Sequence, residues 1–185
     1  MSTETEPQAL LVMDVQPGIV SRLEHPDEFL EKVKQAVDAA HGHHIPVIYV
    51  VVGFRPGFPE VSAQNKSFGA IKESALPAMI DPRPVLEPEE GDVVVVKRRV
   101  SAFTGSDLEV VLRGKEVRHL VLAGIATGGV VLSTTREAAD KDYRLTILSD
   151  LCADTDPQVH AVLIEKLFPR QATVITGAEW ARTLG

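Results

Sequence analysis

The sequence is poor in several features that would otherwise direct its interpretation. One cysteine, Cys152, excludes an internal disulfide. Aromatic residues make up 5% of the chain, so the core must be built mainly from aliphatic side chains. Basic residues number 19 against 26 acidic ones, and the densest basic run is only Lys97-Arg98-Arg99. Nucleic acid is therefore disfavoured as a partner, because phosphate contacts supply most of such affinity.

Long apolar runs and targeting patterns are also missing. No run approaches the ~20 apolar residues that a membrane span needs, so no membrane association is expected. Met1 to Pro7 are polar and acidic, without the basic-then-apolar order of a secretory signal. We expect a flexible tail over residues 1–8, a single domain over residues 9–185, and a cytoplasmic location. A composition of 44% hydrophobic and 24% charged residues is typical of such a domain.

What the chain does contain is an alternation of β-branched runs with amphipathic stretches. This predicts a three-layer α/β/α, Rossmann-like fold, with helices on both faces of a six-stranded, mainly parallel sheet. Residues 93–96 are valine at every position, which predicts a strand buried inside the sheet. The six strands are expected at residues 9–15, 46–52, 92–96, 119–123, 144–148 and 172–175.

Helix signals separate these strands. Helices are predicted over residues 29–40, ending near Gly42, and over residues 128–140. Residues 53–68 are rich in proline and glycine, and so long an irregular segment is typical of a loop that covers a substrate. Three further helix starts are marked by capping residues: Ser106 with Glu109, Asp156 before Pro157, and Thr176 with Glu179.

Two charged residues fall where strands meet loops. Ligands of doubly wound sheets bind outside the carboxyl ends of the strands. Asp14 lies near the end of the first predicted strand, and Lys97 follows the third. In apolar surroundings each would favour the charged form of the other, giving a positioned proton donor or acceptor. The alternative is that Asp14 caps a turn and Lys97 reaches solvent.

The glycine-rich segment 124–129 leads from the fourth strand into a helix. Backbone amides at a helix start can bind an oxyanion or carboxylate, although an ordinary tight turn is the alternative. The segment lacks both the Lys-Ser/Thr ending of a P-loop and the spaced glycines of a dinucleotide site. Arg55 and Lys66, on the long loop, are candidates for binding a substrate carboxylate or else are solvated loop charges.

Three motifs in this order resemble those of the isochorismatase-like hydrolase family, also called the cysteine hydrolase family. The first-strand motif is Leu11-Val12-Met13-Asp14-Val15-Gln16. The lysine motif is Lys97-Arg98-Arg99-Val100-Ser101-Ala102-Phe103 with Ser106-Asp107-Leu108. The nucleophile loop is Gly124-Ile125-Ala126-Thr127-Gly128-Gly129-Val130-Val131, continued by Glu137-Ala138. The resemblance extends from about residue 9 to residue 185.

The resemblance implies roles for individual residues. Asp14 and Lys97 would be catalytic, and the peptide bond before Ala126 would be cis. The amides of Ala126 and residue 130 would form an oxyanion hole in a substrate-binding loop that includes Thr127 and Gly129. The family's nucleophilic cysteine is replaced by Val130, whose alkyl side chain cannot form a thioester. Cys152 does not align with that position and is expected to be a buried structural residue.

Two functions from different classes remain open. The first is hydrolysis of a small anionic metabolite by Asp14 and Lys97 without a cysteine, as in family members that cleave a vinyl ether. Those members carry Tyr-Ala-His where this chain has Ala126-Thr127-Gly128, which disfavours isochorismate itself. A variant of this chemistry uses the Thr127 hydroxyl, or water activated by Asp14, on an amide. The second is a catalytically inactive protein that binds a small molecule or serves as a scaffold.

No metal or other cofactor is expected. Related enzymes of the nicotinamidase type bind a metal through an aspartate and histidines after the second strand, whereas residues 52–67 contain neither. His41, His43 and His44 cluster at a predicted helix end, where histidine commonly interacts with the helix dipole. Because family members are commonly dimers or larger, the resemblance also implies a homo-oligomer.

Overall fold

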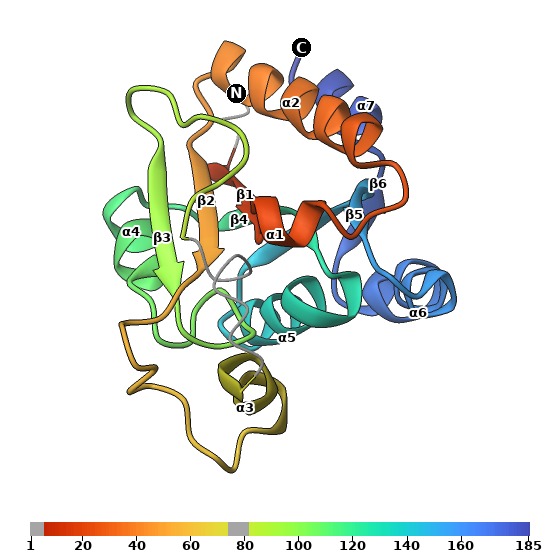
Figure 1. The fold of residues 1–185 in the computed structure, drawn as a ribbon. Coiled ribbons are helices and arrows are strands. Elements are labelled where there is room, and N and C mark those ends of the chain that lie inside the picture. Colours follow the sequence, from red (N-terminus) through yellow and green to blue (C-terminus); the bar gives the residue numbers. More distant parts are fainter. Residues whose placement is uncertain (1–5, 74–81) are drawn as a thin grey trace.

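A computed structural model describes residues 6–73 and 82–185 of the chain (Figure 1). Of the expected tail, residues 1–5 lie outside the described residues. Six strands, all parallel, form one sheet in the order β3-β2-β1-β4-β5-β6, which confirms the predicted α/β class. Their bounds are β1 Gln8–Met13, β2 Val47–Val52, β3 Val93–Lys97, β4 His119–Ile125, β5 Arg144–Ala153 and β6 Thr173–Ile175.

Helices cover both faces of this sheet (Figure 1). Along β1, Leu10 and Val12 pack on one face, and Leu11 and Met13 on the other, because successive strand side chains alternate. The first face packs against α2 (Pro26–Gly42) and α7 (Gly177–Arg182), and the second against α4 (Leu108–Gly114), α5 (Leu132–Asp140) and the turns after α6 (Pro157–Val162). The remaining elements are α1 Pro17–Val20, α3 Lys66–Glu73 and the turns Thr127–Val131, Leu163–Leu167 and Phe168–Arg170.

The strand order fixes where a ligand is expected. The chain first builds outward from β1 through β2 to β3, and then returns to place β4 on the other side of β1. In such sheets the crevice opens at the carboxyl ends of the two central strands, where the direction of winding reverses. Here those strands are β1 and β4, which are followed by Asp14 and by the segment starting at Ala126.

The prediction that the valine run lies inside the sheet is wrong. Strand β3 is an edge strand, paired only with β2, and the side chain of Val94 is 41% exposed. A continuous apolar run indicates burial on both faces only when neighbouring strands and helices cover it. The sequence of one strand does not contain the order of the others, so the periodicity alone misplaced this strand.

Two of the three predicted helix starts are correct. Asp156 accepts the amide protons of Gln158 and Val159, and Thr176 forms a complete capping box with Glu179. The box predicted for Ser106 does not form, because α4 begins one residue later, with Asp107 in the N-cap position. The Ser106 hydroxyl instead donates to the carbonyls of Ala102 and Phe103 and closes the preceding turn, while Glu109 pairs with Arg113 and Lys141.

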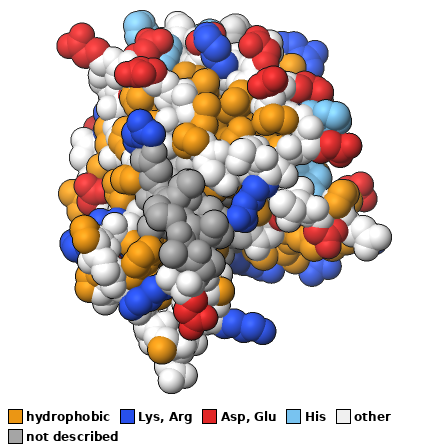
Figure 2. All heavy atoms as spheres, in the orientation of Figure 1, with side chains coloured by type: hydrophobic (Ala, Val, Ile, Leu, Met, Phe, Trp, Pro, Cys, Tyr) orange, Lys and Arg blue, Asp and Glu red, His pale blue; other side chains and the backbone are white. Residues whose placement is uncertain are grey.

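Charges of both signs are distributed over the surface. Figure 2 shows acidic and basic side chains interspersed with apolar atoms, and the acidic ones are densest along the end where α2 lies. Helix α2 contributes to this through Asp27 and Glu28 in its first turn. Among residues 6–73 and 82–185, no helix has the length and apolar character needed to cross a membrane.

Candidate active site

Asp14 and Lys97 meet at the carboxyl end of the sheet. The ammonium nitrogen of Lys97 lies 2.9 Å from Asp14 Oδ2, and the two side chains are 2% and 9% exposed. Lys97 Nζ also donates to the carbonyl of Arg99, 2.9 Å away. An ammonium group carries three donors, and contacts with the described residues use two of them, so one remains for the cavity that Lys97 lines. The alternative in which Lys97 reaches solvent is therefore wrong.

The backbone after β1 is shaped to aim Asp14 into this site. Its φ of 57° lies in the left-handed region, which aspartate tolerates better than most residues. The Asp14 amide donates to the carbonyl of Val50 at 2.7 Å, which anchors it to β2. Two residues on, the buried side chain of Gln16 donates to the Val52 carbonyl and accepts from the Val52 amide. Hydrogen bonds to β2 thus fix both the end of β1 and the turn that follows it.

Close approach of the two central strands also depends on Gly124 in β4. A Cβ atom built there would lie 2.5 Å from the carbonyl oxygen of Met13, the residue before Asp14. Any larger residue would push β1 and β4 apart where they flank the site.

Burial dominates the electrostatics of Asp14. It raises the pKa of the carboxyl from its ordinary 3.8 to about 6, although the nearby Lys97 ammonium acts in the opposite direction. Oδ2 faces Lys97, whereas Oδ1 is buried and has no hydrogen-bond partner among the described residues. A buried oxygen without a partner is costly, so this atom is available for a group brought by a ligand.

The segment after β4 forms the opposite wall. The peptide bond between Ile125 and Ala126 is cis, as the resemblance implied. The chain then makes a wide turn over Thr127–Val131 that departs from helical geometry at Gly129. Ala126, Gly129 and Val130 line the cavity beside Asp14. The site therefore presents an alkyl side chain at position 130.

Thr127 lies outside the set of described residues that line the cavity. Its hydroxyl is fully buried and lies 2.8 Å from His160 Nδ1 on α6. The adjacent Gly128 amide donates to Asp154 at 2.7 Å. Both contacts attach the turn to the segment after β5. Thr127 thus fixes the shape of the loop instead of presenting its hydroxyl to the cavity.

The cavity around the Asp14–Lys97 pair has a volume of about 280 Å³. Its outer wall is apolar and comes partly from α3, through Phe68 and Ile71. Only the last three residues of the predicted loop, 66–68, belong to α3, and they are helical, not irregular. Arg22, in the turn after α1, also lines the cavity. Sequence reasoning missed Arg22, although its position shortly after the first strand is a signal that the strand-end rule could have used.

The two loop cations predicted to bind substrate lie elsewhere. Arg55 forms an ion pair with Glu60 at 2.5 Å, and the backbone oxygen of Glu60 accepts from the guanidinium of Arg99. Arg55 thus helps to hold the loop against the lysine segment. Lys66 is exposed at the start of α3. Neither residue is among the described residues that line the cavity.

Cys152 lies within β5, paired with Gly124 of β4, because this strand extends to Ala153 and not only to the predicted residue 148. The residue is 5% exposed, and burial raises the pKa of its thiol to about 12. A thiol that stays protonated makes a poor nucleophile.

Within the described residues, no group of three or more His, Cys, Asp or Glu side chains could hold a metal ion.

Known proteins resemble this chain in sequence and in fold. The isochorismatase domain matches residues 8–179. The isochorismatase family protein YwoC of Bacillus subtilis is 29% identical, covering 92% of this chain and 90% of its own. The ureidoacrylate amidohydrolase RutB of Stutzerimonas stutzeri is 30% identical over 81% of this chain and 71% of its own. An isochorismatase family structure from Burkholderia thailandensis superposes with a TM-score of 0.87 at 29% identity, covering 98% and 97% of the two chains. The chain belongs to the isochorismatase family.

Proposed function

We propose that this protein is a hydrolase that cleaves a small anionic metabolite by proton transfer from Asp14, with water as the nucleophile. The observation that carries the proposal is the buried Asp14–Lys97 pair, in which Asp14 Oδ1 has no partner among the described residues. Perturbed titratable groups in a cleft are typical of catalytic sites. No thiol is found among the described residues that line the cavity, so the chemistry must proceed without one.

The geometry supports a general acid more strongly than a base. Lys97 donates to Oδ2, so the proton of the neutral carboxyl resides on Oδ1. A carboxyl group whose pKa is about 6 can donate this proton to a substrate atom near neutral pH. Water would then add to the cationic carbon and lose a proton to the Asp14 carboxylate, and the adduct would break its C–O bond to release a carbonyl compound and an alcohol. An enol ether suits this sequence best, because protonation of its carbon creates a cation that water captures readily.

Cations and apolar walls support a small anionic substrate. The Lys97 donor that is not used by Asp14 or Arg99 can bind a substrate oxygen at the base of the cavity. Arg22 lies on the same lining and can bind a carboxylate. A volume of about 280 Å³ limits the substrate to a small metabolite. The relative named as a ureidoacrylate amidohydrolase, by its name, acts on a small carboxylic acid.

Asp14→Asn tests the proposal. The amide keeps the shape but cannot transfer the proton, and we expect turnover to fall by about 10²-fold or more on whichever substrate is found. The assay is a panel of small carboxylates that carry enol ether, ester or amide bonds. Asp38→Asn, on the exposed face of α2, is the matched control and should retain full activity. Undiminished turnover by Asp14→Asn would exclude Asp14 from the mechanism.

The pH profile separates an acid from a base. If Asp14 donates a proton, kcat/KM falls as the pH rises through about 6, because the protonated form is then lost. A limb of the opposite sign would assign Asp14 as a base.

The replacement of the family cysteine by Val130 favours a second function, the binding of a ligand without turnover. Thermal shifts with small carboxylates, unaccompanied by product from any member of the panel, would support that function instead.

A further inference from the structure

The segment that follows Lys97 has no regular secondary structure, yet it holds the catalytic lysine. Between β3 and α4, residues 98–106 form a series of turns, and Ser101, Ala102 and Phe103 are buried in them. The carbonyl of Arg99 accepts a hydrogen bond from Lys97 Nζ. The position of the ammonium group relative to Asp14 therefore depends on what fixes this segment.

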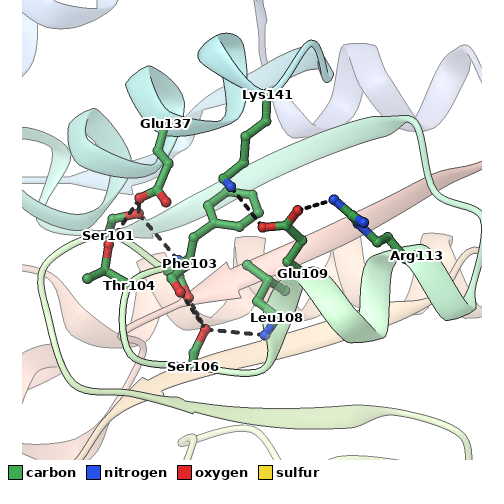
Figure 3. A network of polar contacts seen from close by, with 10 residues as sticks. Ser101, Phe103, Thr104, Ser106, Leu108, Glu109, Arg113, Glu137 and Lys141 are labelled. Atoms are coloured by element: carbon green, nitrogen blue, oxygen red, sulfur yellow. Dashed lines mark hydrogen bonds and ion pairs between the residues drawn. The ribbon is translucent and has the colours of Figure 1, made fainter.

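Helix α5 supplies that attachment through Glu137 (Figure 3). Glu137 Oε2 accepts hydrogen bonds from the hydroxyls of Ser101, at 2.5 Å, and Thr104, at 3.2 Å. One turn earlier on the same helix face, the Thr134 hydroxyl accepts from the Ala102 amide at 3.0 Å. Hydrogen bonds to an ionised carboxylate are about twice as strong as neutral ones, so Glu137 provides the stronger anchor.

Helix α5 is also the continuation of the opposite cavity wall. It begins at Leu132, directly after the turn that carries Gly129 and Val130. Glu137 thus connects the element that bears one wall of the cavity with the segment that bears the lysine. On its other side the segment is held by the Arg99 guanidinium, which donates to the carbonyl of Glu60.

We propose that Glu137 is a positioning residue for the Asp14–Lys97 pair. Its carboxylate fixes the hydroxyls of Ser101 and Thr104, and this orients the Arg99 carbonyl that keeps the Lys97 ammonium against Asp14. This inference rests on the proposed catalytic role of the pair. Its test reads the carboxyl of Asp14 directly and needs no substrate, so its failure is distinguishable from a failure of the proposed function.

The test is the titration of Asp14 in Glu137→Ala, followed by the carboxyl resonance of ¹³C-labelled aspartate and assigned by its loss in Asp14→Asn. A displaced ammonium group stabilises the carboxylate less, so we expect the midpoint to rise by about one pH unit. Removal of the Glu137 charge alone would not raise the midpoint, because the loss of a negative charge cannot disfavour ionisation of another carboxyl group. Among the described residues, the charged groups that line the cavity with Asp14 are Lys97 and Arg22.

Two variants serve as controls. Glu137→Gln keeps an oxygen that can accept from both hydroxyls and should leave the midpoint close to that of the wild type. Glu109→Ala removes an equal charge from the same network, but its contacts are Lys141 and Arg113 (Figure 3), so it should also leave the midpoint unchanged. An unchanged or lowered midpoint in Glu137→Ala would overturn the proposal.

A second variant covers the case in which Glu137→Ala does not fold. Ser101→Ala with Thr104→Val removes the two hydroxyl donors and keeps the carboxylate, and we expect the same upward movement of the Asp14 midpoint. In a folded Glu137→Ala background these substitutions should add little, because they break the same contact. An unaltered midpoint in the hydroxyl variant would show that the segment is fixed by other contacts.

Discussion

At the scale of single residues, Asp14 combines two features that are unfavourable for stability. It adopts a left-handed backbone conformation, and it buries a carboxyl oxygen that has no partner among the described residues. A pair buried to this degree does not by itself indicate a gain in stability, since desolvation can exceed the attraction between the charges. Such unfavourable local features are concentrated at functional sites. This is the physical reason to regard the pair as catalytic.

The charge of Arg22 leads to a prediction at the same scale. If Arg22 binds the substrate carboxylate at the cavity lining, Arg22→Met should raise KM about tenfold or more with a smaller change in kcat, because binding and not proton transfer is affected. Steady-state kinetics on a carboxylate substrate measure this. Arg55→Met is the matched control, as Arg55 pairs with Glu60 outside the cavity lining. An equal rise in KM in both variants would argue against a specific contact.

At the scale of elements, the sequence predicted the strands well and their surroundings less well. Asp14 and Lys97 were found because parallel strands bring their carboxyl ends to one edge of the sheet. Arg55 follows β2 in the same way, yet its side chain turns to Glu60. The strand-end rule places a backbone position, whereas the direction of a long side chain depends on charges supplied by a loop that has no periodicity to predict it.

Capping boxes show the same limit. The patterns at Ser106 and Thr176 are alike in sequence, but only Thr176 forms a capping box. The Ser106 hydroxyl accepts from the amide of Leu108 at the start of α4, but it also donates to carbonyls of the preceding turn, and that turn is shaped by contacts with α5, far away in the sequence. A capping pattern thus predicted the helix start correctly where no other described part of the chain formed hydrogen bonds with the same hydroxyl.

The box that does form predicts a measurable loss of stability. Thr176 accepts from the Glu179 amide, and Glu179 accepts from the Thr176 amide at 2.7 Å. Thr176→Ala should cost about 1 kcal/mol of unfolding free energy. Thermal unfolding should show a Tm lower by about 2–4 °C. Glu179→Gln preserves an acceptor and should change the Tm less, and equal losses in both would indicate that charge at the helix start matters more than the hydrogen bonds.

At the scale of the whole molecule, the site results from the winding of the sheet. Asp14 follows β1, the 126–131 segment follows β4 beside it, and Lys97 comes from the edge strand β3 across β2. Elements from both halves of the chain therefore meet at one point only when β3, β2, β1 and β4 are paired. The ionisation of Asp14 is consequently coupled to global folding.

This coupling predicts an unusual contribution to the pH dependence of stability. The pKa of Asp14 is about 6 in the folded protein and near the ordinary 3.8 once the chain unfolds. Because the folded value is the higher one, the contribution to stability is fully present below about 3.8 and is lost as the pH rises through 6. Its size is roughly 3 kcal/mol, from two pH units at about 1.4 kcal/mol each.

Asp14→Asn isolates this contribution, since the other titrating groups are common to both proteins. We expect wild type to become more stable relative to the variant as the pH is lowered from 7 to 4, measured as the difference between the two unfolding free energies in urea. If the Lys97 ammonium governed the ionisation of Asp14 more strongly than burial does, the folded pKa would lie below 3.8 and wild type would lose relative stability over the same range. If the difference between the two unfolding free energies were the same at every pH, Asp14 would be hydrated in the folded protein. A hydrated carboxyl group could not serve as the proposed acid.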